Sequence, residues 1–139
     1  MFSKKILSSL PSSIRTLRRL SACSLNEGLT FQQFRVLNQA AEGLGQTQIS
    51  QNLQISTAAI SKMVDSLVQK ELLVKEEGSD RRSLRLKLTP EGKRMRKLVT
   101  DHVEKALNKS FKKLTDKEKS DLVKGLDVLD KLMGYVNEN

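Results

Sequence analysis

The sequence predicts a mainly α-helical chain of the α+β class, with one small two-stranded β-hairpin near its middle. Most apolar residues recur at intervals of three and four, the period of amphipathic helices. Leu84, Leu86 and Leu88 alternate with polar residues after a polar turn, which is typical of a strand in a hairpin. With 139 residues, the chain is long enough for one compact domain with a moderate core.

The first elements are predicted from proline and capping signals. Pro11 suits the first position of a helix, so we expect a helix from Pro11 to about Glu27. Residues 1–10 would then form a separate short helix or an arm. Thr30 and Gln33 have the spacing of a capping box, which predicts the start of the next helix.

A helix-turn-helix unit follows this second helix. Gly43 and Gly45 interrupt the helical period, and a short helix is expected over residues 46–53. A tight turn then leads to Ser56, whose hydroxyl can cap another helix that runs to about Lys70. Two helices joined by so short a turn form a supersecondary unit that commonly presents its second helix to DNA.

The second half of the chain is predicted to be a hairpin followed by two helices. Residues 72–74 and 84–88 are expected as strands, joined by the polar turn Gly78–Arg82. Thr89–Glu91 begins a long helix with a cap, a proline at the first position and an acidic residue near the helix dipole. A second capping box over residues 115–118 begins the last helix, whose apolar spacing is similar to a coiled-coil seam.

The helix after Ser56 carries a polar face with short side chains near its N-terminus. Such side chains can reach base edges when the helix lies in a major groove, where Ser, Thr and Lys form hydrogen bonds and Ala contacts a thymine methyl. An ordinary solvated face would give the same pattern on this helix alone. The candidate DNA-binding residues are Ser56, Thr57, Ala58, Ser61 and Lys62.

The predicted hairpin turn adds a second candidate contact with DNA. Arg81 and Arg82 lie in a turn without large apolar groups, which suits a narrow, electronegative minor groove. The chain carries 25 Lys and Arg against 16 Asp and Glu, a formal net charge of +9 that favours a polyanionic partner. A polar-faced helix followed directly by a basic hairpin therefore favours binding to double-stranded DNA.

Specific motifs in this region resemble those of a known family. Asp80–Ser83 followed by Leu88–Gly92 matches a D-x-R motif leading into an L-T-x-x-G helix start. Leu29–Leu37 and Leu53–Ser56 add further matches before the polar-faced helix. On these motifs the chain resembles the MarR family of winged helix-turn-helix transcription regulators, with compatible helices outside the matched region.

The resemblance implies roles for the candidate residues. Arg82 would enter the minor groove at the tip of the wing, beside Arg81, and Asp80 would hold the wing arginine through a charge-assisted hydrogen bond. The recognition-helix candidates named above would read bases. The family further implies an obligate homodimer on a palindromic operator, more often repressing than activating, and in many cases a small phenolic or lipophilic effector.

Four positions depart from the family pattern. Gly45 stands where a capping Ser or Thr is preferred, and Ser50 where a small apolar residue is usual. Glu71 stands where a glycine usually precedes the first strand, and Lys75 where an arginine is common. These departures concern local packing of the helices and the hairpin.

Cys23 is the chain's one cysteine, so no intrachain disulfide is expected, which suits the reducing cytoplasm of a prokaryote. Residues 1–26 lack acids, as organelle transit peptides do, and Leu20–Cys23 spells a lipoprotein cleavage box. A basic first helix is the favoured interpretation, because arginines interrupt the apolar stretch that such a box needs.

A peroxide-sensing branch of the family keeps a reactive cysteine near the position of Cys23, and Arg18 and Arg19 could favour a thiolate. An inert cysteine is favoured over this redox role, since the branch's tyrosines are missing.

The remaining expectations concern organisation and alternatives. Residues 1–29 are expected as an N-terminal arm and dimerisation helix, 30–89 as the DNA-binding region and 90–139 as dimerisation helices, within one compact domain. No cofactor, metal site or enzymatic activity is expected, because His102 and Cys23 offer no triad or ligand cluster. No membrane span is expected either, because the sequence has no run of 18 apolar residues. Two alternatives remain open: a winged-helix module that binds another protein, and a protein that coats DNA without sequence preference.

Overall fold

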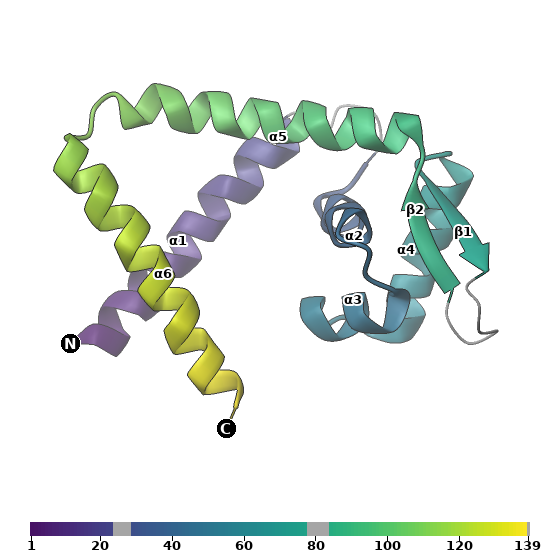
Figure 1. The fold of residues 1–139 in the computed structure, drawn as a ribbon, viewed down its shortest axis with the longest axis horizontal. Coiled ribbons are helices and arrows are strands. Elements are labelled where there is room, and N and C mark those ends of the chain that lie inside the picture. Colours follow the sequence, from purple (N-terminus) through teal and green to yellow (C-terminus); the bar gives the residue numbers. More distant parts are fainter. Residues whose placement is uncertain (24–28, 78–83, 139) are drawn as a thin grey trace. The chain divides into compact units, whose positions relative to one another are not determined.

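The computed structural model describes residues 1–23, 29–77 and 84–138, which form six helices and one two-stranded sheet (Figure 1). Contacts along the chain divide it into two units, Met1–Val103 and Glu104–Asn139, which are described separately below. The mainly α-helical class with a small β-hairpin is confirmed.

The first helix, α1, spans Phe2–Cys23 without interruption. The predicted helix start at Pro11 is therefore wrong, as is the separate short helix or arm before it, because Pro11 lies inside the helix. A proline there removes one hydrogen bond to the carbonyl of Leu7. Leu7 is 74% exposed, so water can hydrate this carbonyl and the helix continues. The predicted end near Glu27 lies outside the described residues.

The next three helices are α2 (Phe31–Ala41), α3 (Gln46–Leu53) and α4 (Thr57–Gln69), as the capping signals predicted. The Thr30 hydroxyl accepts a hydrogen bond from the Gln33 N–H at the start of α2, and the reciprocal bond of the capping box is also formed. The guanidinium of Arg18 lies 5.0 Å from the centre of the Phe31 ring, which connects α1 to the start of α2.

Three residues with positive φ separate these helices from their neighbours. Gly43, after α2, has a φ of 83°, where a glycine carries no steric cost. Gln54, between α3 and α4, has a φ of 53°, and Glu71, after α4, has a φ of 61°. Both are non-glycine residues in the left-handed region, and they lie at the entrance and the exit of α4.

The hairpin consists of β1 (Leu73–Glu77) and β2 (Leu84–Leu88), paired antiparallel from Leu73 opposite Leu88 to Glu77 opposite Leu84. The first strand begins one residue later than predicted and continues for three residues further. Its polar second half continues as a strand because β2 offers a pairing partner at every position.

Helix α5 (Pro90–Phe111) begins in close contact with the end of α4. The Thr89 hydroxyl accepts a hydrogen bond from the Gly92 N–H at 3.0 Å and donates one to the carbonyl of Glu71 at 2.6 Å. A Cβ atom on Gly92 would collide with the backbone carbonyl of Leu72. The glycine of the L-T-x-x-G motif is therefore needed because the two backbones touch.

The core of Met1–Val103 is built by α2, α3, α4, the hairpin and the first half of α5. Its members are apolar residues from every one of these elements, so the helix-turn-helix and the hairpin share one core. Those with at most 1% exposure are Val36, Leu37, Ile49, Ile60, Val64, Leu67, Leu73 and Val99.

The second unit contains the end of α5 and helix α6 (Asp116–Asn137), which begins at the predicted capping box of Thr115 and Glu118. None of the described residues of α6 is buried. Leu126 is 50% exposed and Val128 is 66% exposed. No helix in the described ranges is long and apolar enough to cross a membrane.

Candidate nucleic-acid interface

Helix α4 is fixed in place by one apolar face. Ile60, Val64 and Leu67 are fully buried against the core, and Met63 packs beside them. The Ser56 hydroxyl accepts a hydrogen bond from the Ala59 N–H at 3.2 Å and so caps the helix, as predicted. Because the buried face is determined by packing, the opposite face of α4 points to solvent.

The five candidate residues of this helix lie together on its cap and first two turns. Ser56, Thr57, Ala58 and Lys62 are exposed, as the helical period predicted, whereas Ser61 is half-buried. The exposed set offers two hydroxyls, a methyl group and one ammonium within two turns of a helix N-terminus. These side chains can donate hydrogen bonds to base edges, and the N-terminus of the helix can bind a phosphate.

Gln33 connects the start of α2 to the end of α4. Its side-chain oxygen accepts hydrogen bonds from the Thr30 N–H at 3.0 Å and from the ammonium of Lys70 at 3.1 Å. Its side-chain amide donates to the Ser66 hydroxyl at 3.0 Å. The sequence identified Gln33 as a capping residue, but it carried no signal for the contact with α4, which joins residues 33 positions apart.

A salt bridge connects α4 to the hairpin. The ammonium of Lys75 on β1 lies 2.6 Å from a carboxylate oxygen of Asp65 on α4. Asp65 is exposed on the outer face of α4, and its side chain keeps 62% of its exposure. Sequence analysis noted Lys75 only as a departure from the family pattern, whereas in the structure this lysine joins β1 to α4.

The wing candidates Asp80, Arg81 and Arg82 lie outside the described residues. The structure describes the strands on either side of residues 78–83, and these strands are paired up to Glu77 and Leu84. On β2, Leu86 and Leu88 face the core while Arg85 and Lys87 are exposed. Cys23 is the last residue of α1. Its side chain lies outside what the structure describes, so the inert thiol stays a prediction.

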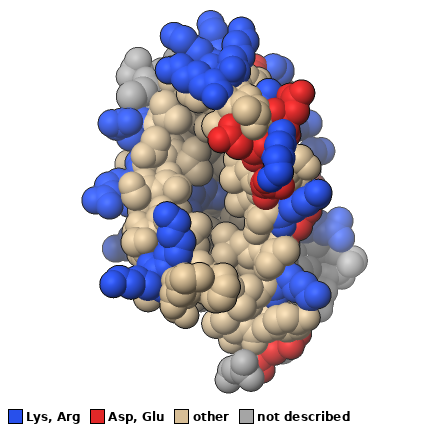
Figure 2. All heavy atoms as spheres, turned by 90° about the vertical axis from the view of Figure 1, so that its left-hand side faces the viewer, with Lys and Arg blue, Asp and Glu red and all other residues tan. Residues whose placement is uncertain are grey.

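Positive charge is prominent on the molecular surface. On the face drawn in Figure 2, Lys and Arg side chains outnumber Asp and Glu, in line with the formal net charge of +9. Across the described ranges, no group of three or more His, Cys, Asp and Glu residues could hold a metal ion. His102, on α5, is exposed.

Comparisons with known proteins bear on the family and the fold of the chain. A sequence model of the MarR family matches residues 27–83, a range that includes α2, α3, α4 and β1. No curated protein sequence matches the chain.

Several solved structures share the fold. The crystal structure of RV1404 from Mycobacterium tuberculosis has 26% identity and a TM-score of 0.81, covering 96% of this chain and 95% of that one. A MarR family protein from Bacillus stearothermophilus has 19% identity and a TM-score of 0.83, covering 96% of each chain. A Staphylococcus aureus MarR in complex with salicylate and kanamycin has 18% identity and a TM-score of 0.79, covering 96% of this chain and 93% of that one.

Proposed function

Since this chain belongs to the MarR family of winged helix transcription regulators, we propose that it binds a palindromic operator as a homodimer and represses transcription in the cytoplasm. It acts by binding rather than by catalysis. The observation that carries the proposal is the exposure of Ser56, Thr57, Ala58 and Lys62 on a helix whose opposite face is fully buried.

Helix α4 is the proposed recognition helix in the major groove. Thr57 and Ser61 donate or accept hydrogen bonds at base edges, Ala58 contacts a thymine methyl, and Lys62 reaches a guanine or a phosphate. The N–H groups beside Ser56 receive a backbone phosphate. The shared hydrophobic core supports this role because it fixes the hairpin against the helix, and the Asp65–Lys75 bridge adds a contact between them.

The connection between β1 and β2 is the proposed wing. Arg82 enters the minor groove, where the negative potential is strongest, and Arg81 contacts the adjacent backbone. Asp80 holds the wing arginine by a charge-assisted hydrogen bond. The antiparallel pairing of the flanking strands supports this assignment, since it brings Glu77 and Leu84, the residues on either side of the connection, opposite one another.

The dimer is formed by the N- and C-terminal helices in this proposal. Support comes from apolar side chains that remain exposed in the single chain, including Leu122 at 43% and Leu126 at 50% on α6. These residues line an apolar groove of about 450 Å³ together with Phe111 at the end of α5. A twofold dimer places two recognition helices about 34 Å apart, the spacing of successive major grooves.

A small effector would act on this spacing. The Staphylococcus aureus neighbour was solved with salicylate, which supports a small phenolic or lipophilic ligand as the class of effector. A ligand lowers operator affinity only by the difference between its affinities for the two spacings.

The test is selection of bound duplexes from a random DNA library at near-physiological salt. We expect an inverted repeat with half-sites about one helical turn apart. Lys62→Ala and Arg82→Ala should weaken binding to that repeat, and Arg82→Ala should lower the salt slope by about one. Lys105→Ala, an exposed lysine on α5, is the control and should change binding little.

Three outcomes would contradict the proposal or its contacts. Weak binding that salt abolishes, without a selected motif, would instead support a DNA-coating protein. Absence of DNA binding would support a module that binds another protein. Full operator affinity in both Lys62→Ala and Arg82→Ala would remove these residues from the interface.

A further inference from the structure

The turns before and after α4 share one arrangement. Each contains a non-glycine residue with positive φ, Gln54 before the helix and Glu71 after it. In each turn, a side-chain hydroxyl from another element donates a hydrogen bond to a backbone carbonyl at or next to that residue. The two hydroxyls belong to Ser50 and Thr89, and neither residue is among the proposed contacts with DNA.

Ser50 closes the turn before α4. It lies on α3 and is 7% exposed, so its hydroxyl needs a partner inside the protein. The hydroxyl donates to the Ile55 carbonyl at 2.5 Å, and the Ser50 carbonyl accepts a hydrogen bond from the Ile55 N–H at 3.1 Å. Two bonds in opposite directions therefore join α3 to the residue that precedes the Ser56 cap of α4.

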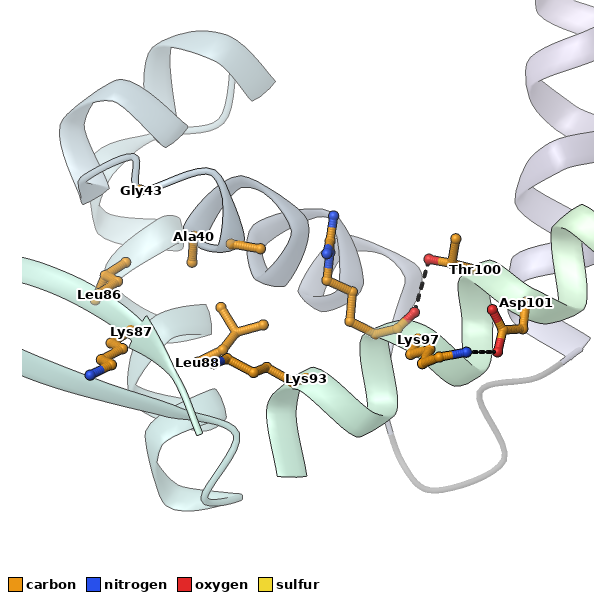
Figure 3. A pocket seen from close by; sticks show the side chains of 11 residues that line it. Ala40, Gly43, Leu86, Lys87, Leu88, Lys93, Lys97, Thr100 and Asp101 are labelled. Atoms are coloured by element: carbon orange, nitrogen blue, oxygen red, sulfur yellow. Dashed lines mark hydrogen bonds and ion pairs between the residues drawn. The ribbon is translucent and has the colours of Figure 1, made fainter. Parts of the chain in front are cut away.

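Thr89 closes the turn after α4. Its hydroxyl donates to the Glu71 carbonyl at 2.6 Å, and its N–H donates to the Leu72 carbonyl at 3.1 Å. Thr89 lies between β2 and α5, and Figure 3 shows Leu88, at the end of β2, beside Lys93 near the start of α5. The end of α4 is therefore connected to a junction 18 residues further along the chain.

The two hydroxyl bonds act where the backbone has competing conformations. The left-handed region is unfavourable for a residue with a side chain, and a change of φ at Gln54 or Glu71 would tilt all 13 residues of α4. Apolar packing attaches α4 to the core, and a directional hydrogen bond at each end adds a limit on its tilt. Two of the four departures from the family pattern, Ser50 and Glu71, lie in these turns.

We propose that Ser50 and Thr89 are positioning residues for DNA recognition, which hold α4 at the angle that lets Thr57, Ala58 and Lys62 reach the bases together. This inference rests on the proposed role of α4 as the recognition helix. Each hydroxyl acts through a backbone carbonyl and does not touch DNA. Hydrogen bonds to base edges weaken steeply with changed geometry, whereas attraction to phosphates depends mainly on charge. The two bonds therefore affect discrimination between base sequences more than general affinity for DNA.

The first test uses the full chain without DNA, so its result is independent of operator binding. Backbone amide hydrogen exchange is followed by NMR in Ser50→Ala and in Thr89→Val, each of which removes one hydroxyl. Because a neutral hydrogen bond is lost, we expect exchange about fivefold faster at Ile55 in the first variant and at Leu72 in the second. Thr89→Ser keeps the hydroxyl and should exchange as the unsubstituted protein does.

The second test compares affinity for the selected inverted repeat with affinity for a shuffled duplex of the same length. Ser50→Ala and Thr89→Val should each lower this ratio about fivefold, with little change in binding to the shuffled duplex. A loss of stability alone would leave the ratio unchanged, since it is measured on molecules that remain folded. Thr89→Ser should keep the ratio of the unsubstituted protein.

Two hydroxyls that bond within a single helix provide matched controls. The Thr100 hydroxyl donates to the Arg96 carbonyl one turn back on α5 at 2.9 Å (Figure 3), and the Ser110 hydroxyl donates to the Ala106 carbonyl at 3.3 Å. Thr100→Val and Ser110→Ala remove the same groups without touching either turn. Hydrogen exchange in both turns and the affinity ratio should therefore stay unchanged.

Specific results would overturn the proposal. Unchanged exchange at Ile55 and Leu72 would show that the hydroxyls do not hold the turns. Faster exchange with an unchanged affinity ratio would show that they hold the turns without positioning α4 for recognition. If the unsubstituted protein selects no repeat, the proposed function and the role in recognition both fail, and the exchange result still decides whether the hydroxyls hold α4.

Discussion

Helices α4 and α6 both begin at a hydroxyl cap and both carry an apolar face, yet the chain uses these faces differently. Three residues of α4 are fully buried, whereas no described residue of α6 is buried. The orientation of α4 is therefore determined inside one chain. The apolar face of α6 is left for contacts that its own unit does not supply, and a second copy is the proposed source of them.

The difference shows how the chain separates two tasks. The face that meets DNA requires a fixed backbone, and the shared core around α4 provides it. The association surface can be completed later, when a partner arrives, because exposed apolar area contributes stability only once it is covered. The predictions below test this separation, beginning with the largest expected effect.

Gly92→Ala should destabilise the first unit by about 3 kcal/mol, the cost of forcing a backbone apart in a packed region. The Cβ of the alanine would clash with the backbone carbonyl of Leu72, and neither backbone segment can move away easily. Urea denaturation followed by circular dichroism measures the loss. Gly125→Ala on α6 is the control: no atom lies within 4 Å of its Cβ, so the better helix former should be neutral or slightly stabilising. Equal losses in the two variants would contradict the close approach at Gly92.

Leu126→Glu should weaken self-association at least about tenfold and leave the fold of the single chain unchanged. Leu126 is 50% exposed, so its charge meets water in the monomer but an apolar surface in the dimer. Sedimentation at several protein concentrations measures the change. Ser120→Glu, an exposed substitution on the same helix, should associate as the unsubstituted protein does. Unfolding of the Leu126→Glu monomer would mean that α6 is packed within its own chain.

Gln33→Ala should cost about 1–2 kcal/mol, because it removes a capping bond and the contacts with Ser66 and Lys70 on the α4 side. Gln48→Ala is a matched control at the start of α3. There, among the described residues, the equivalent oxygen accepts one longer contact, 3.5 Å from the Gly45 nitrogen. Thermal unfolding measures both variants. A loss for Gln48→Ala as large as that for Gln33→Ala would show that the contact with α4 contributes nothing.

The smallest effect concerns pH at the start of α6. Hydrogen bonds from the backbone N–H and the hydroxyl of Thr115 hold the pKa of the Glu118 carboxyl below its usual value of 4.5. The unfolded chain therefore binds a proton at Glu118 more readily than the folded chain does. The stability that the ionised Glu118 contributes to the folded state is thus present above pH 4.5 and is lost as pH falls through the lowered pKa. An NMR titration of the Thr115 amide should show this transition. Glu118→Gln should abolish it, and an unchanged titration in that variant would assign the transition to another group.

Local signals predicted most of the fold. The capping boxes at Thr30 and Thr115, the Ser56 cap and the alternating leucines of β2 were all confirmed, because each depends on residues close in sequence. The prediction at Pro11 was wrong because the outcome there depends on the exposure of the helix and not on residues close in sequence. Its preference for the first helical turn is real, but an exposed helix tolerates the lost hydrogen bond. Local propensity alone did not reveal that exposure.

Contacts between elements could not be predicted in the same way. The bond from Arg96 to Asn38, the Asp65–Lys75 bridge and the link from Gln33 to α4 depend on how helices and strands pack. Periodicity placed Thr57, Ala58 and Lys62 correctly on the open face but gave no warning that Ser61 is half-buried. The roles of Asp80, Arg81 and Arg82 remain predictions from the resemblance.

The two left-handed residues that flank α4 have a consequence for how the helix can move. A side chain at Gln54 or Glu71 restricts the backbone far more than a glycine would, although each costs about 1 kcal/mol of conformational strain. The joints at both ends of α4 are therefore stiff. Replacing both residues with glycine would relieve the backbone strain and also increase the conformational freedom of the backbone. These two effects on stability oppose one another, so the melting temperature would stay nearly unchanged while the mobility of α4 increases. Rigidity at this element is thus a property that melting temperature alone would not reveal.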